Sequence, residues 1–159
     1  NYGAKDKKRI KKSFLYCVLL ETFAVTILSG IICLAHKPLC LLVLKKDKEI
    51  TAEAMNYALQ SLMLIGLPYA LWGIGGCFAC YLRGMKYSVT PTIVSLVCIV
   101  GVRMIFILGL FNISYFHTYS WVIATYPLSW TACCIVYIPI VILLSKKKFR
   151  QMPELQKYY

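Results

Sequence analysis

Two charged side chains, Glu21 and Arg103, lie inside long apolar runs, where a charge is costly unless it is paired or used. A carboxylate there can bind a proton or a cation, and a guanidinium can bind an anionic group. By helical rise, Glu21 lies about 10 Å and Arg103 about 20 Å from the basic ends of their runs. Two long side chains can therefore meet if their helices adjoin. Glu21 and Arg103 are either functional groups or an intramembrane ion pair that stabilises a bundle.

Aromatic residues in the same runs offer a second kind of chemistry. The faces of Tyr69, Trp72 and Tyr126 can line a cavity that receives flat, apolar cations. Aromatic side chains in membrane bundles also serve as packing, and this alternative stays open for each of them. Together with Arg103, these three residues form the candidate substrate cavity.

The residue pattern of an enzyme is not found in the sequence. His36 and His117 lie near the ends of apolar runs, no Ser/His/Asp arrangement occurs, and no G-x-x-x-x-G-K sequence is present to hold a nucleotide. Cys77 and Cys80 form a C-x-x-C pair, but within an apolar segment thiols usually act as small packing groups. We therefore expect a protein that is not an enzyme and that has no cofactor and no resident metal.

The elements that carry these residues are long and apolar. The chain is 60% hydrophobic and 15% charged, too apolar for a water-soluble domain of 159 residues. A membrane-spanning helix needs about 20 apolar residues, and four segments meet this length: 14–34, 55–82, 89–111 and 121–144. The sequence therefore predicts an all-α integral membrane protein with four transmembrane helices.

The distribution of Lys and Arg predicts the orientation of these spans, because cytoplasmic loops carry an excess of basic residues. Thirteen Lys and Arg fall in the segments 1–13, 83–88 and 145–159, whereas four fall in the loops on the other side. We therefore expect a multi-pass protein of the plasma membrane, with a cytosolic basic loop at 1–13 and a cytosolic basic tail at 145–159. The net charge of +12 then follows from topology and from contact with the lipid bilayer, not from binding nucleic acid.

The second predicted span, 55–82, should be bent. Pro68 near its middle removes a backbone hydrogen bond, and Gly66 and Gly73 are among the residues that soften it further. Bent, glycine-rich helices are typical of alternating-access transporters, although Gly and Pro are common in membrane helices generally. Pro127 and Pro139 in the last span leave the same two interpretations open.

Four short motifs, taken in order, resemble the multidrug and toxin extrusion (MATE) family of transporters. NYGAKDKKRIKKS at 1–13 resembles the loop before the family's ninth helix, and YLRGMKYSVTP at 81–91 is similar to the loop between its tenth and eleventh helices. VRMIF at 102–106 and YPLSW at 126–130 resemble the last two helices. Met85 and Lys86 depart from the family pattern, which often has a second glycine at this turn.

The resemblance implies that the four spans are helices nine to twelve of a twelve-helix, two-lobe transporter, and that the remaining helices of that protein are their partners. It implies a multidrug antiporter that exports organic cations or amphipathic xenobiotics in exchange for Na⁺ or H⁺. The coupling site is not identifiable, because the segment that matches the tenth helix, 55–82, contains no acidic residue. The alternatives are a lipid-linked polysaccharide flippase of the same superfamily and a non-catalytic membrane scaffold subunit.

Overall fold

The computed structural model describes residues 1–44 and 52–152, and in this part of the chain every regular element is a helix. The predicted all-α class is thereby confirmed. The long helices are α1 (Lys7–Leu34), α3 (Ala52–Gly66), α4 (Tyr69–Gly84) and α7 (Tyr119–Gln151). The shorter elements are α2 (His36–Leu44), α5 (Val89–Ser95), η1 (Leu96–Gly101), α6 (Val102–Ile105), η2 (Phe106–Leu110) and η3 (Ser114–Phe116).

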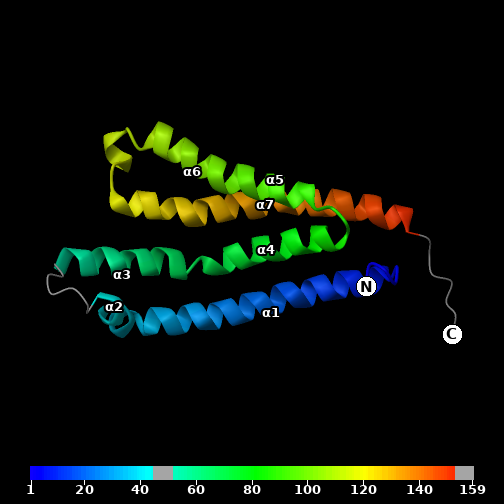
Figure 1. The fold of residues 1–159 in the computed structure, drawn as a ribbon, viewed down its shortest axis with the longest axis horizontal. Coiled ribbons are helices and arrows are strands. Elements are labelled where there is room, and N and C mark those ends of the chain that lie inside the picture. The colour runs from blue at the N-terminus through cyan, green and yellow to red at the C-terminus, as the bar shows by residue number, and fades with distance from the viewer. Residues whose placement is uncertain (45–51, 153–159) are drawn as a thin grey trace.

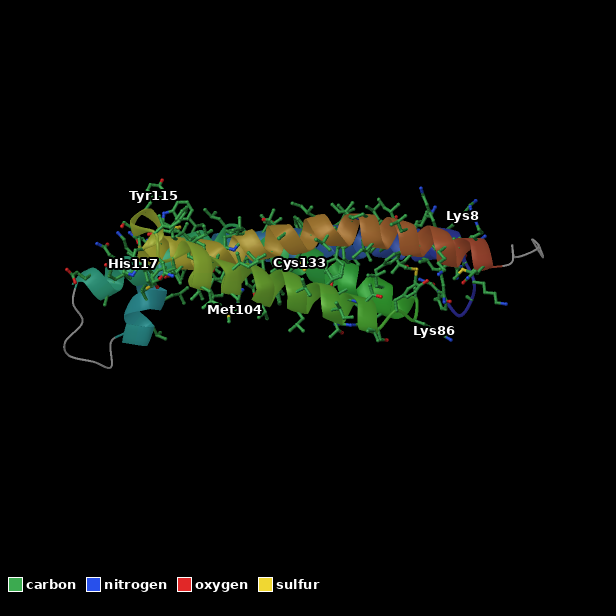
Figure 2. The ribbon with its side chains drawn as sticks, turned by 90° about the horizontal axis from the view of Figure 1, so that it is seen from above. Lys8, Lys86, Met104, Tyr115, His117 and Cys133 are labelled. Atoms are coloured by element: carbon green, nitrogen blue, oxygen red, sulfur yellow. The ribbon has the colours of Figure 1, made fainter. Side chains whose placement is uncertain are left out.

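The long helices lie side by side in a row (Figure 1). Helix α1 packs against α3 and α4, these two pack against α7, and α7 packs against η1 and α6. Consequently α1 and the α5–η2 segment occupy opposite edges of the row, with α4 and α7 between them. Figure 2 shows Lys8 and Lys86 at one end of the molecule and Tyr115 and His117 at the other.

Three helical segments are long and apolar enough to cross a membrane, and the bent α3–α4 pair makes a fourth. Helix α1 begins at Lys7, inside the predicted basic loop, because the Asp6 side chain accepts a hydrogen bond from the Arg9 amide and caps the first turn. Helix α7 likewise continues to Gln151, so the basic run 146–150 is helical. Residues 153–159 of the predicted tail and residues 45–51 of the loop between the first two predicted spans lie outside the described residues.

The bend predicted at Pro68 is confirmed. Helices α3 and α4 meet at 42°, and the break falls at Leu67 and Pro68. Proline has no amide hydrogen for the preceding turn and its ring collides with the carbonyl four residues earlier. Pro127 and Pro139, by contrast, lie within α7, which continues past both as one helix.

The third apolar segment departs from a regular α-helix, which the sequence did not predict. Two π-helical stretches, η1 and η2, flank the single α-helical turn α6 that contains Arg103. The α5 helix, which precedes η1, is bonded to the fully buried Tyr137 of α7. The Tyr137 hydroxyl donates to the Pro91 carbonyl at 2.9 Å and shares a hydrogen bond with the Ser95 hydroxyl, also at 2.9 Å. These bonds fix α7 to α5 where the backbone changes its winding.

Candidate functional site

Trp130 on α7 is the centre of an aromatic cluster that consists of Tyr69, Trp72, Tyr126 and Trp130. Its side chain is buried, and its ring centroid lies 5.6 Å from that of Tyr69, 6.0 Å from that of Trp72 and 6.4 Å from that of Tyr126. The Tyr69 and Tyr126 rings meet it edge to face, the arrangement that aromatic quadrupoles favour. The structure thus brings the three predicted aromatic residues together through a fourth.

Helical spacing explains how two elements build this cluster. Tyr69 and Trp72 are three residues apart at the start of α4, directly after the Pro68 break, and Tyr126 and Trp130 are four apart on α7. Residues at these spacings share one face of a helix. Sequence reasoning did not select Trp130, although its spacing from Tyr126 within the YPLSW motif was a usable signal.

Arg103 joins the aromatic cluster from α6. Its guanidinium carbon lies 4.0 Å from the centroid of the Tyr126 ring, a cation–π contact between α6 and α7. The Arg103 Nε is buried and has no hydrogen-bond partner among the described residues. The Tyr126 face is therefore one group that stabilises this charge.

Glu21 does not pair with Arg103, so the candidate ion pair is not formed. The two helices that carry these residues lie at opposite edges of the row, with α4 and α7 between them. The Glu21 carboxylate instead lies against Gly73 of α4, where a Cβ atom on residue 73 would overlap it. In the described part of the chain one ion pair is present, between Arg9 and Asp6 at an exposed helix start.

A cavity of about 200 Å³ lies beside the aromatic cluster, between α4, η1 and α7. Trp72, Trp130 and Tyr137 contribute its aromatic walls, and Arg83 contributes a cation that sequence reasoning did not assign to a cavity. Tyr69 lines a different hollow, apolar and about 390 Å³, between α1 and α3. Arg103 and Tyr126 are not among the lining residues of either hollow. The predicted set therefore forms one cluster, and its four members do not together line either of these two hollows.

The C-x-x-C pair contacts a third thiol. The Cys77 sulfur lies 3.6 Å from that of Cys17 on α1, and the cysteines of the described residues are free. Among these residues no group of three or more His, Cys, Asp or Glu side chains is arranged to hold a metal ion. The thiols therefore pack α1 against α4.

Comparison with known proteins identifies one relationship. Residues 1–108 match the family model described as MatE. No curated protein and no solved structure matches the chain.

Proposed function

The chain belongs to the MatE family of membrane transporters, and from this premise we propose that it contributes helices nine to twelve to an antiporter. That antiporter exports organic cations or amphipathic xenobiotics from the cytosol across the plasma membrane in exchange for Na⁺ or H⁺. The observation that carries this proposal is the aromatic cluster at the break between α3 and α4. A bent helix can rock against its neighbours, and Tyr69 and Trp72 of the cluster lie on α4, which begins at the break.

The cavity beside the cluster favours a flat, partly apolar substrate. At about 200 Å³ it is smaller than a typical ligand pocket, so helices outside this chain are expected to complete it. The Trp72 side chain is 46% exposed, so its indole is accessible to a ligand. The Trp130 side chain is 5% exposed and packs against the Trp72 ring. Tyr126 already holds the Arg103 guanidinium. We therefore expect an organic cation to stack on Trp72 and not on Tyr126.

A lipid-linked polysaccharide flippase is less well supported. A pyrophosphate group is held best by several Arg or Lys side chains that donate charge-assisted hydrogen bonds. The cavity has one such side chain, Arg83, and Arg103 is held against Tyr126 outside it. A scaffold subunit, the other alternative, needs neither the break between α3 and α4 nor the exposed indole of Trp72 beside it. The antiporter accounts for both features.

The test is efflux of ethidium from a pump-deficient bacterium that expresses the complete gene containing this sequence. We expect efflux that stops when a protonophore or a sodium ionophore collapses the ion gradients. Trp72→Leu should lower the efflux rate about tenfold, in line with a loss of one to two kcal/mol of cation–π binding. Trp121→Leu, a matched change outside the cluster, should leave it near the wild-type rate. Good membrane expression without efflux of any organic cation would refute the proposal.

A further inference from the structure

The Glu21 carboxylate lies in a space beside α4 that is free because Gly73 has no side chain; this space is here called the seat. A Cβ atom on residue 73 would overlap Oε1 and Cδ of Glu21, so the carboxylate lies directly on the backbone of α4. The second oxygen, Oε2, is buried and has no hydrogen-bond partner among the described residues. A bare carboxylate in apolar surroundings is strongly destabilised. The seat therefore favours a carboxyl whose charge is neutralised.

The groups around Glu21 do not supply that neutralisation. Among the described residues, the thiols of Cys17 on α1 and Cys77 on α4 each lie one turn from Glu21 or Gly73, and Tyr69 lies one turn before Gly73; none of these groups is a cation. The charged or titratable residues of the other packed elements lie far along the row: His36 and Lys37 on α2, Glu53 and Tyr57 on α3, and Arg83 at the far end of α4. From Glu21 to His36 alone the helical rise is about 22 Å.

A proton suits this seat better than a metal cation does. Hard cations require several oxygen ligands at once, and the described surroundings of Glu21 include the backbone at Gly73 and the thiols of Cys17 and Cys77 but no group of acidic or other ligand side chains that could hold a metal ion. Protonation needs one oxygen only and converts the carboxylate into a neutral group that α1 and α4 can enclose. A site with one free carboxyl oxygen therefore favours a proton over a metal cation, which needs several ligands.

We infer that Glu21 is a proton-binding residue at the α1–α4 interface and that Gly73 holds its carboxyl in place. Within the proposed antiporter, and resting on that proposed function, the proton on Glu21 is the coupling ion of this lobe. It is bound while α1 and α4 are packed as observed and is released when water reaches the carboxyl. The role differs from that of a structural ion pair, which would need a cation, and the described residues place none at the seat.

The first test does not depend on transport. Dicyclohexylcarbodiimide enters membranes and modifies protonated carboxyls: the acid proton moves to a carbodiimide nitrogen, the carboxyl oxygen attacks the central carbon, and rearrangement leaves a stable acylurea. Peptide mass spectrometry of the full-length transporter then reads residue 21 directly. We expect Glu21 to react at neutral pH, and to react more completely there than the exposed Glu53 of the same molecules. No modification of Glu21 at neutral pH, or a pH profile that coincides with that of Glu53, would overturn the inference.

Two glycine variants separate the seat from general packing. Gly73→Ala places a methyl group where the carboxylate lies, and a flexible side chain can move away from it, so the protein should still fold while the labelling profile of Glu21 shifts towards that of Glu53. Gly76→Ala, one turn further on, meets open space and should label as wild type. Equal profiles in the two variants would contradict the role of Gly73.

Transport by Glu21→Gln then tests the coupling. In vesicles we expect this variant to equilibrate ethidium but not to accumulate it against its gradient when a proton gradient is imposed. Proton-driven accumulation equal to that of the wild type would remove Glu21 from coupling. If the wild type itself moves no organic cation, the antiporter proposal fails, whereas the labelling result still decides whether Glu21 binds a proton.

Discussion

At the scale of single residues, the two intramembrane charges are stabilised in different ways. Arg103 lies on the face of Tyr126, and Glu21 lies on the backbone at Gly73. A guanidinium stays protonated in any protein environment and must be solvated where it lies, whereas a carboxyl can become neutral. The permanent charge of Arg103 therefore needs a partner such as the Tyr126 ring. Glu21 can lie beside Gly73 without a cation because its carboxyl can take up a proton.

The Arg103–Tyr126 contact gives a prediction on stability. Tyr126→Leu should lower the free energy of unfolding by about 1–2 kcal/mol because it removes a partly desolvated cation–π contact, and Tyr126→Phe should cost much less because the ring remains. The measurement is thermal unfolding of the purified full-length transporter in detergent. Tyr16→Leu, at an exposed ring on α1, is the matched control. Equal losses in Tyr126→Leu and Tyr126→Phe would show that the hydroxyl matters and the ring face does not.

At the scale of elements, the α3–α4 break sets the direction of the candidate site. Helix α4 starts immediately after Pro68, and its first turn carries Tyr69 and Trp72 towards α7. The same type of residue has no such effect in α7, where Pro127 and Pro139 leave the helix continuous. The break at Pro68 coincides with small neighbours such as Gly66, which leave the backbone free to change direction.

Replacing the prolines one by one tests what the break contributes. Pro68→Ala restores an amide hydrogen, so α3 and α4 should join into a straighter helix and Trp72 should turn away from Trp130. We expect ethidium efflux to fall several-fold at equal membrane expression. Pro127→Ala and Pro139→Ala are the controls and should change efflux little, because α7 is already continuous. A Pro68→Ala transporter with full efflux would show that the bend is dispensable.

At the scale of the whole molecule, most basic residues of the described chain lie at one end of the row of helices. Lys8 and Lys86 lie there, and the aromatic segment with Tyr115 and His117 lies at the opposite end (Figure 2). Near the basic end, Lys148 lies over the rings of Tyr2 and Tyr87, and Lys11 lies over that of Phe149. These contacts hold the ends of α1 and α7 together and keep their charges at one level, as an interface with anionic lipid headgroups requires.

This arrangement predicts the membrane topology. Reporter fusions to the full-length gene after Lys86 should give fluorescent protein and inactive alkaline phosphatase, because the excess of basic residues predicts that this loop faces the cytosol. Fusions after Phe116 should give the reverse pattern. Replacing Lys86 with Ala in the first fusion is the control and should not invert the result, since twelve other basic residues share its side. Active phosphatase after Lys86 would place the basic end outside the cytosol.

Much of the fold followed from the sequence, because apolar runs and proline act locally. The length of an apolar run decides whether a helix can cross a bilayer, and Pro68 with Gly66 two residues before it favours a break in its own helix. Tyr69 and Trp72 share one face of α4 for a similarly local reason, their spacing, whereas their meeting with Tyr126 required α4 to pack against α7. The start of α1 at Lys7 was missed, although Asp6 was a readable cap.

Only the tertiary structure decided which helices are neighbours. The order of the row places α4 and α7 between α1 and α6, so Glu21 meets Gly73 and Arg103 meets Tyr126. The sequence gives the depth of each residue along its helix through the helical rise. Those depths allowed Glu21 and Arg103 to pair, but the structure does not form this pair. The order of helices in a bundle depends on side-chain packing between segments far apart in the chain. For the same reason Trp130 became the centre of the site, since its three ring partners come from two different helices.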